Sequence, residues 1–490
     1  MSTLPVIAVV GTTGVGKSNL AIDIALALNG EVINADSMQV YKGLDVITNK
    51  VTLEERGMAV HHLLDFVDPI QEEDYSVLKF EKDALRVITD IHSRGRVPIL
   101  VGGTHYYIQS ILWDSNLVSS STTAPDTQKQ ELVEEVQEPK DEPHASIPAD
   151  LSVQISSALE NSDASFKYKS ESEQDAIVLE LGRLLDVVDP VMATRWHPKD
   201  WRKIRRSLQV YFTMGERHSE ILNRQKEEGG GSLRFRTCVF WLWAENKALD
   251  LRLDNRVDVM IKNGLFDEII DMRRRVREAN NGIYEIDYTR GIMQTIGFKE
   301  FDAYLTQLEG PQDNPSSLES LKKQSVESMQ AATRRYARRQ VTWIKNKLGP
   351  KCLEESLKPT MSTNVSFWAL DATDLGLWKT NVREKGVRLC KEFLSGTFDT
   401  KPSPLTAKLL NLDSASSHTF TASGSKQTDW KPRYCEICTE EKTGEAKLIH
   451  GAREWDIHMK SNSHAKMVKR AKWKAEFKLW EENKRQKTSE

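Results

Sequence analysis

The sequence predicts an α/β protein whose core is a doubly wound parallel sheet. Four short apolar segments read as buried strands, at residues 5–10, 31–35, 97–101 and 237–243. Helical patterns at 17–28 and 77–94 lie between the first three, and this alternation is typical of parallel strands joined by right-handed crossovers. A glycine-rich segment separates the first strand from the first helix, which is where such sheets hold phosphate groups.

Changes in composition divide the 490 residues into segments, as expected for a chain too long for one small core. Residues 114–175 carry fourteen acidic residues against four lysines, with few aromatic residues, so we expect most of this stretch to be a disordered insertion. The predicted segments are a P-loop core (1–113), the acidic insertion (114–175), a helical insertion domain (176–232), the second part of the core with basic helices (233–396), a linker (397–429), a small C-terminal module (430–475) and a basic tail (476–490).

The overall composition is that of a globular enzyme in a reducing compartment. Hydrophobic residues make up 39% and charged residues 28%, and the net charge of −3 says little about partners. Five scattered cysteines argue against a disulfide framework. No run approaches the roughly 20 apolar residues of a membrane span, and the first strand begins too early for a cleaved leader. We therefore expect a cytoplasmic protein with no membrane partner; mitochondrial and nuclear pools stay open as alternatives.

Residues 11–18 match the phosphate-binding pattern G-x-x-x-x-G-K-[ST]. Its glycines let backbone N–H groups converge on phosphate oxygens, Lys17 supplies a cation, and Ser18 can ligate Mg²⁺. The N-terminus of the next helix adds the positive end of its dipole. By its form this is an ATP-binding motif, but alone it identifies neither the phosphate compound nor the reaction. The predicted phosphate-binding residues are Gly11, Thr12, Thr13, Gly14, Val15, Gly16, Lys17 and Ser18.

Asp36 ends the second predicted strand, at the edge of the sheet where doubly wound folds bind ligands. The third strand instead runs into Gly102, Gly103 and Thr104, without the acidic residue that NTP hydrolases use to hold magnesium. Asp36 is therefore a candidate base or metal anchor, and a helix N-cap is the alternative.

Seven segments, taken in order, resemble the tRNA dimethylallyltransferase family, whose members are also called tRNA isopentenyltransferases. Together they cover about residues 5–350 apart from the acidic insertion, and their order is more specific than any one of them. The segments are the loop at 11–18, INADSMQVYKGLDVITNK (33–50), VGGTHYYIQSIL (101–112), DWRKIRRSLQVY (200–211), LRLDNRVDVMIKNGL (251–265), QTIGFKEF (294–301) and ATRRYARRQVTWIKN (332–346).

The resemblance implies transfer of a dimethylallyl group from dimethylallyl diphosphate to N6 of the adenosine 3′ to the tRNA anticodon. The P-loop would then hold the diphosphate of the donor, Asp36 would be the general base, and Ser18 would line the centre with Mg²⁺. Thr104 would lie at the substrate channel, and Arg252 or Arg256 would neutralise the departing diphosphate. The residues implied in tRNA binding are Asp36, Ser37, Met38, Gln39, Thr104, Arg202, Lys203, Arg205, Arg206, Gln294, Thr295, Gly297, Lys299, Arg334, Arg335, Arg338 and Arg339.

Two basic segments favour RNA as the partner. Residues 322–347 carry eight Lys or Arg residues and one Glu, with Tyr336 and Trp343 interleaved, and their arginines form pairs spaced i,i+4 along a helix. A second group, at 202–206, lies at the start of another predicted helix. Such segments are expected to track the phosphates of the anticodon stem-loop, and a solvated helix face is the alternative.

The C-terminal module carries a predicted zinc site. Cys435 and Cys438 form a Cys-x2-Cys knuckle, and His458 and His464 follow with five residues between them. Four N and S ligands suit a closed tetrahedral Zn²⁺ site. The gap between Cys438 and His458 is longer than usual, which leaves His450 as a competing ligand. The segment resembles the matrin-type or U1-like C2H2 fingers of RNA-binding proteins, as in the eukaryotic branch of the family.

Two other functions stay open at this point. A P-loop kinase would fill the same loop with ATP, but it would need an adenine pocket and lid arginines that the sequence does not reveal. A non-catalytic RNA-binding protein would keep the finger and the basic helices, and the intact Lys17, Ser18 and Asp36 argue against it. We expect His105, within the Gly-Gly-Thr segment, to be a packed or hydrogen-bonded histidine. Nothing in the sequence argues against a monomer.

Overall fold

The computed structural model describes residues 4–70, 75–114, 144, 146–162, 166, 169–227, 231–279, 286–288, 290–310, 315–357, 365–397, 401–412, 430, 432–439 and 446–473. The chain divides into two compact units. The first comprises residues 1–117 and 231–420, and the second comprises 118–230 and 421–490. Among the described residues, no helix combines the length and the apolar character needed to cross a membrane.

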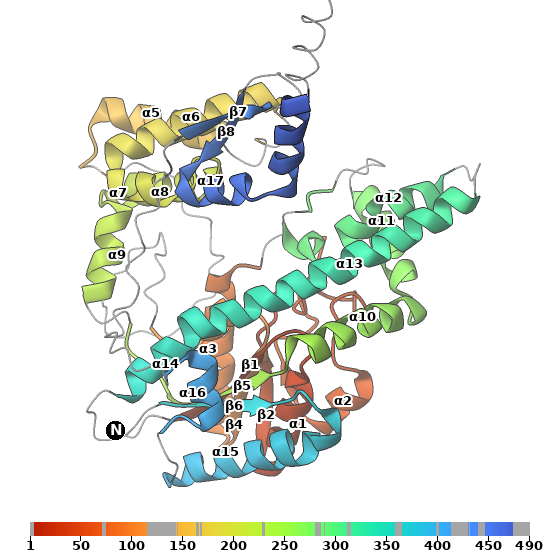
Figure 1. The fold of residues 1–490 in the computed structure, drawn as a ribbon. Helices are drawn as coiled ribbons and strands as arrows, with labels where there is room; N and C mark the ends of the chain where they lie inside the picture. The colour runs from red at the N-terminus through yellow and green to blue at the C-terminus, as the bar shows by residue number, and fades with distance from the viewer. Residues whose placement is uncertain are drawn as a thin grey trace, which may run out of the picture. The chain divides into compact units, whose positions relative to one another are not determined.

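The first unit is built around a six-stranded sheet in which every strand pairs in parallel with its neighbours (Figure 1). Its strands are β1 (Pro5–Gly11), β2 (Gly30–Asn34), β3 (His61–His62), β4 (Val97–Gly102), β5 (Arg236–Trp243) and β6 (Val365–Asp371). They lie in the order β3-β2-β4-β1-β5-β6. The connections between strands change direction across the sheet beside β1. Doubly wound sheets bind ligands in the crevice at such a point, beyond the carboxyl ends of the strands.

Side chains of β1 alternate between two cores, one on each face of the sheet. Ala8 and Val10 belong to the core that also contains Phe80 of α3 (Val77–Ser93). Ile7 and Val9 belong to the opposite core, with residues of α1 (Lys17–Leu28) and α15 (Lys385–Ser395). Figure 1 shows α1 and α15 beside each other against the sheet. Burial on both faces explains why β1 is an unbroken apolar run rather than an alternating one.

The remaining helices of the first unit include α13, a 29-residue helix that packs along α10 and α12 (Figure 1). These helices are α2 (Leu53–Met58), α4 (His105–Leu112), α10 (Asn246–Lys262), α11 (Leu265–Ala279), η2 (Gly291–Gln294), α12 (Phe298–Glu309), α13 (Pro315–Trp343), η3 (Ile344–Leu348), α14 (Gly349–Ser356), η4 (Leu375–Leu377), η5 (Lys379–Glu384) and α16 (Pro404–Leu410).

The four predicted strands are confirmed as β1, β2, β4 and β5, and the doubly wound parallel sheet is confirmed with them. Two further strands of this sheet were not predicted. β3 is two residues long, which is too short to leave a sequence pattern. β6 is an apolar run of the same kind as the other strands, so the composition of 365–371 was a usable signal.

The second unit contains a helical bundle and a small β-hairpin module. Its elements are α5 (Ala149–Asn161), α6 (Glu171–Val188), α7 (Pro190–Arg195), α8 (Trp201–Met214), α9 (His218–Glu227), β7 (Pro432–Thr439), β8 (Ala446–His450) and α17 (Gly451–Met459). Leu184 and Leu185 of α6 pack with Leu208 and Phe212 of α8 in the core of the bundle.

The prediction of a disordered insertion is wrong for 149–161 and 171–175, which are helical. In α5, Ile155, Ala158 and Leu159 lie on one face at helical spacing and enter the core of the bundle, although the average composition there is polar. Residues 115–143 lie outside the described residues, and disorder there stays a prediction.

The predicted linker also contains structure, because α16 packs on β6. The Thr406 hydroxyl accepts a hydrogen bond of 2.9 Å from the backbone N–H of Ala369, and Leu410 joins the core. β6 ends the sheet, so this hydroxyl gives its edge a hydrogen-bond partner. Residues 413–429 and the basic tail at 476–490 lie outside the described residues.

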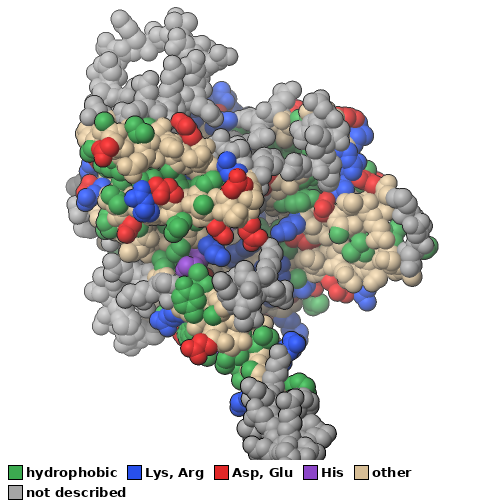
Figure 2. Space-filling view, turned by 90° about the horizontal axis from the view of Figure 1, so that it is seen from above, with side chains coloured by type: hydrophobic (Ala, Val, Ile, Leu, Met, Phe, Trp, Pro, Cys, Tyr) green, Lys and Arg blue, Asp and Glu red, His purple; other side chains and the backbone are tan. Residues whose placement is uncertain are grey.

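Acidic and basic side chains are mixed on one face of the molecule. On the face seen in Figure 2, acidic and basic side chains are interspersed rather than segregated, in keeping with a net charge of −3. Any basic surface for RNA must therefore be sought in particular helices rather than in the whole molecule.

Candidate active site

The P-loop follows β1, and the side chain of Lys17 hydrogen-bonds within the loop. The Nζ atom of Lys17 donates a hydrogen bond of 2.8 Å to the carbonyl oxygen of Thr12. Gly14 and Gly16 adopt φ values of 75° and 94°, and a Cβ atom on Gly14 would lie 2.7 Å from the Leu253 side chain. Only glycine fits both the angle and the space there.

Arg256 of α10 brings a second cation to the loop. Its Nη1 atom donates a hydrogen bond of 2.8 Å to the Thr13 hydroxyl. Desolvation lowers the pKa of Lys17 to about 8, and the charge of Asp36 opposes this change while that of Arg256 adds to it. Desolvation likewise lowers the pKa of Arg256 to about 10, again opposed by Asp36. Two partly dehydrated cations are therefore ready to receive an anion.

Asp36 lies in the turn that follows β2. Its Oδ1 atom accepts a hydrogen bond of 3.0 Å from the backbone N–H of Met38, and its Oδ2 atom lies 3.6 Å from where a Cβ atom on Gly103 would stand. No helix begins at Asp36 among the described residues, so the N-cap alternative is excluded. One carboxylate oxygen holds the turn, and the other lies toward Gly103.

Two cavities meet at Asp36. The polar cavity, of about 270 Å³, is lined by Lys17, Ser18 and Asn34 among others. The second, of about 300 Å³, is lined by apolar side chains that include Met38, Ile47 and Met329. Four residues line both cavities, namely Thr13, Asp36, Thr48 and Arg256. An anionic group and an apolar group joined by one bond could therefore occupy adjoining spaces.

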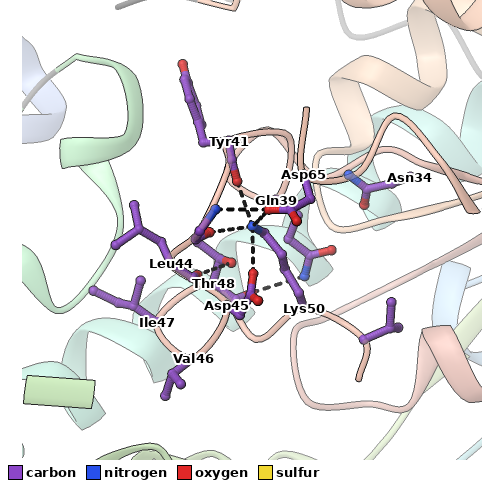
Figure 3. Close-up of polar contacts among 12 residues, drawn as sticks. Asn34, Gln39, Tyr41, Leu44, Asp45, Val46, Ile47, Thr48, Lys50 and Asp65 are labelled. Atoms are coloured by element: carbon purple, nitrogen blue, oxygen red, sulfur yellow. Dashed lines mark hydrogen bonds and ion pairs between the residues drawn. The ribbon is translucent and has the colours of Figure 1, made fainter. Parts of the chain in front are cut away.

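The loop that follows Asp36 is held rigid by Lys50 (Figure 3). The fully buried Nζ atom of Lys50 donates to the carbonyl oxygen of Tyr41 at 2.6 Å and pairs with Asp45 at 2.9 Å and with Asp65 at 2.5 Å. Leu44 adopts a φ of 58° in this loop, a strained value for a side-chain-bearing residue. A buried charge with several oxygen partners can maintain such a conformation.

Two further side chains hold the same loop. The Gln39 amide donates hydrogen bonds of 3.0 Å to the carbonyl oxygens of Thr48 and Asn49. The Glu268 carboxylate accepts from the backbone N–H groups of Val46 at 2.9 Å and Ile47 at 2.7 Å. Gln39 was predicted to touch tRNA, but its amide supports the wall of the cavities. Lys50 and Glu268 were not predicted as site residues; Lys50 ends one of the family segments.

Gln340 of α13 was also missed, although it lies in the family segment 332–346. Its Oε1 atom accepts a hydrogen bond of 2.8 Å from the backbone N–H of Thr13, and its Nε2 atom donates one of 3.0 Å to the carbonyl oxygen of Gly103. A Cβ atom on Gly103 would lie 2.4 Å from this Nε2 atom, which explains the glycine. Gln340 thus joins the P-loop to the end of β4.

Thr104 and Arg252 do not line either cavity. The Thr104 hydroxyl accepts a hydrogen bond of 3.0 Å from the backbone N–H of Ser37, so it positions a residue that does line the apolar cavity. Arg252 donates a hydrogen bond of 2.8 Å to the carbonyl oxygen of Ala372 and another to that of Thr373. Of the two predicted diphosphate-neutralising arginines, the geometry therefore selects Arg256.

His105 is packed, as predicted. Its side chain is 4% exposed and lies beside the backbone of Gly11. Burial, with the charge of Lys17, lowers the pKa of His105 to about 3. The ring is therefore neutral at physiological pH and adds no charge beside the P-loop.

The basic residues of α13 fall into two sets. Arg334 forms an ion pair with Asp254 of α10, and Arg338 pairs with Asp250 at 2.7 Å. Arg335 and Arg339 are exposed, and Arg339 lines the apolar cavity. The first pair therefore joins two helices, and the second pair remains available for phosphates.

The other predicted RNA-binding residues are spread over several elements. On α8, Lys203 pairs with Asp200 at 2.5 Å, Arg206 donates to Gln209 at 3.2 Å, Arg202 lies over the Trp201 ring at 5.6 Å, and Arg205 is half-buried. Gln294 and Thr295 line the apolar cavity. Gly297 packs on Ile47, and Lys299 is exposed.

The predicted zinc ligands come together in the hairpin module. Ligand atoms of Cys435, Cys438, His458 and His464 all lie within 4.8 Å of one another, and both sulfurs lie within 3.7 Å of the Nδ1 atom of His464. The Nε2 atom of His458 is buried without a hydrogen-bond partner, as expected of an atom that binds a metal ion. His450 is outside this cluster, because its ring faces that of His197 at 5.3 Å. These residues fit a tetrahedral Zn²⁺ ion.

Comparisons with known proteins agree on one family. The sequence pattern of the IPP transferase family matches residues 39–347. The chain is 37% identical over 478 residues to the tRNA dimethylallyltransferase of Mus musculus, covering 96% of this chain and 86% of that protein. It is 36% identical over 474 residues to the tRNA dimethylallyltransferase of Schizosaccharomyces pombe, covering 96% of each. A crystal structure of a eukaryotic dimethylallyltransferase acting on tRNA is similar with a TM-score of 0.67 at 32% identity, covering 98% of this chain and 100% of that one.

Proposed function

This chain belongs to the tRNA dimethylallyltransferase family, and on that premise we propose that it transfers a dimethylallyl group from dimethylallyl diphosphate to N6 of the adenosine 3′ to the anticodon of tRNA. The observation that carries the proposal is the position of Asp36 where the polar and apolar cavities meet. The five-carbon group is apolar and the diphosphate is anionic, so the two cavities match the two halves of the donor. The bond to be broken would then lie beside Asp36.

The diphosphate is proposed to bind in the polar cavity. Lys17 and Arg256 line this cavity, and the start of α1 adds the positive end of its dipole. When the bond between the allylic carbon and oxygen breaks, the electron pair leaves with the diphosphate. Both cations face the place where that negative charge develops, which lowers the barrier more than it stabilises the intact donor.

Asp36 is the proposed general base. The new bond joins N6 of the adenine to the allylic carbon, and the proton released from N6 passes to the Asp36 carboxylate. An exocyclic amine is a poor nucleophile, so removing its proton as the bond forms is worth about 10²–10⁴-fold. The hydrogen bond from the Met38 N–H fixes the carboxylate without occupying both oxygens.

A magnesium ion fits the same cavity. Ser18 and Asp36 both line it, and a hydroxyl and a carboxylate are the hard oxygen ligands that Mg²⁺ prefers. When bound, the ion would supply further positive charge to the diphosphate oxygens. We propose that Ser18 would hold the ion, with the Asp36 carboxylate beside it.

RNA is proposed to approach along the exposed side of α13. Arg335 and Arg339 are spaced i,i+4, and Arg339 also lines the apolar cavity, so α13 would carry the phosphate contacts and also border the cavity in which transfer takes place. The target adenosine must leave its stack to reach Asp36, as enzymes acting on bases require.

The experiment uses the full chain with labelled dimethylallyl diphosphate and tRNA, without ATP. Label should appear in RNA as N6-modified adenosine next to the anticodon, and a tRNA with another base at that position is the control. ATP-dependent turnover of a small metabolite, with no label in RNA, would instead favour a kinase.

A further inference from the structure

Trp378 covers the outer side of the P-loop. A Cβ atom on Gly16 would lie 2.6 Å from the Cη2 atom of Trp378 and 2.8 Å from its Cζ3 atom. The edge of the indole ring therefore rests on the glycine itself. The space directly above Gly16 is filled by an aromatic ring.

The indole ring of Trp378 is fixed in place by its neighbours. Trp378 lies beside Asp23 of α1, and the Asp23 carboxylate pairs with Arg383 at 3.1 Å. The indole packs against the core that contains α1 and α15. Moving it would expose apolar surface to water.

The loop that leads to Trp378 is anchored as well. The residues that follow β6 are held by Arg252, through the carbonyl oxygens of Ala372 and Thr373. The Thr373 hydroxyl accepts a hydrogen bond of 3.1 Å from the backbone N–H of Glu245, which follows β5. The ends of β5 and β6 are thus joined, and Arg252 supports the cover instead of facing the diphosphate.

The covered side is where a nucleoside would have to lie. In a P-loop nucleotide the phosphates run across the loop, so the nucleoside and the reacting end lie on opposite sides of it. Asp36 and Gly103 mark the reacting end, beyond β2 and β4, which leaves the side beyond β5 and β6 for a ribose and base. Of the described residues, none in 372–378 lines either the polar or the apolar cavity.

We propose that Trp378 is a specificity-determining residue that excludes nucleoside diphosphates and triphosphates from the P-loop, so that the loop accepts a diphosphate whose only substituent points toward Asp36. This inference rests on the proposed binding of the donor diphosphate in the loop. It explains how a motif with the form of an ATP site serves a donor that has no nucleoside.

The test compares displacement of labelled dimethylallyl diphosphate by ATP and by inorganic pyrophosphate in wild-type protein and in Trp378→Ala. Pyrophosphate should displace the donor equally well from both. ATP should compete at least about tenfold better in Trp378→Ala than in wild type, because the side of the loop beyond β5 and β6 is then open. Trp378→Phe, which lacks the ring edge over Gly16, should change in the same direction. Trp368→Phe, in β6 and packed on the same core, is the matched control and should leave ATP competition as in wild type.

Each other outcome has a distinct meaning. Unchanged ATP competition in both Trp378 variants would overturn the proposal, and weaker ATP competition would show that the indole stacks on a base instead of excluding it. If Trp378→Ala does not fold, the Trp378→Phe result decides. If pyrophosphate fails to displace the donor from wild type, the donor lies elsewhere, and the proposed function falls together with this inference.

Discussion

The side chain of Gln340 joins the backbone N–H of Thr13 to the carbonyl oxygen of Gly103, with hydrogen bonds of 2.8 and 3.0 Å. It is 4% exposed and lies one residue after Arg339 on α13. The helix that carries the proposed RNA contacts is therefore bonded directly to the phosphate loop. The amide uses one donor and one acceptor at once, which neither a carboxylate nor an ammonium could do.

Gln340→Ala should reduce kcat/KM for the donor and destabilise the first unit. The buried Gly103 carbonyl oxygen and the partly buried Thr13 N–H would lose their partner, and a fully buried group left unpaired costs about 1–3 kcal/mol. Gln340→Glu is the matched variant, because it can still accept from Thr13 but cannot donate to Gly103. Steady-state kinetics and thermal unfolding measure both effects. Wild-type kinetics in Gln340→Ala would show that the two bonds do not shape the site.

Asp36→Asn should lower the single-turnover rate by about 10²–10⁴-fold with little change in tRNA affinity. The amide oxygen can still accept the Met38 N–H, so the turn is preserved while the base is removed. Rapid-quench measurement with bound tRNA and donor separates chemistry from binding. A single-turnover rate equal to that of wild type would rule out Asp36 as the base.

The two arginine pairs of α13 should behave differently. Arg335→Gln with Arg339→Gln should weaken tRNA binding and reduce the salt slope of log Kd by about 0.7–0.9 for each RNA phosphate that the variant no longer neutralises. Arg334→Gln with Arg338→Gln removes ion pairs to Asp254 and Asp250 instead.

The second double variant is the control for the first. It should leave the salt slope as in wild type, with a small decrease in thermal stability because these pairs are partly exposed. Filter binding of tRNA at several salt concentrations checks both. Equal slopes for the two double variants would refute the division of the helix into two sets.

The pH profile of kcat/KM for the donor should fall above about pH 8, since this parameter reports groups of the free enzyme. The pKa of Lys17 is lowered to about 8, so its charged form, which binds the diphosphate, is present below that pH and disappears above it. Bound diphosphate favours the ammonium, so the fall in kcat should occur at higher pH. A kcat/KM profile that stays flat from about pH 7 to about pH 9.5 would contradict this role of Lys17.

The C-terminal module should bind one Zn²⁺ ion, and Cys438→Ser should abolish binding. Four ligand atoms lie within 4.8 Å of one another, and metal binding supplies folding free energy in modules of this size. His450→Ala is the matched control, because His450 lies outside the cluster and should not affect zinc content. Metal analysis of the purified variants decides. Absence of zinc from His450→Ala would restore it as the competing ligand.

Periodicity and motif order were enough to predict the parallel sheet, the P-loop, the family and the four zinc ligands. These features depend on short stretches of sequence, since an apolar run makes a strand and glycines at fixed spacing make a phosphate loop. Because α1 connects β1 to β2 as parallel strands, Asp36 after β2 lies at the same edge of the sheet as the P-loop after β1. Local composition failed for α5, whose three buried apolar residues share one helix face within a polar segment. An average over the segment conceals such a face.

What only the tertiary structure decided is which polar side chains meet the site. Arg252 and Arg256 are one helical turn apart on α10, and Arg334 and Arg335 are neighbours on α13, so sequence alone treats each pair alike. Packing turns Arg256 to the P-loop and Arg252 to the carbonyl oxygens after β6, and it places Arg334 against Asp254. Gln340 and Trp378 reach Thr13 and Gly16 across more than 300 residues of chain. A hydrogen bond or a ring contact depends on distances of a few ångströms, and these are fixed only when the helices pack on the sheet.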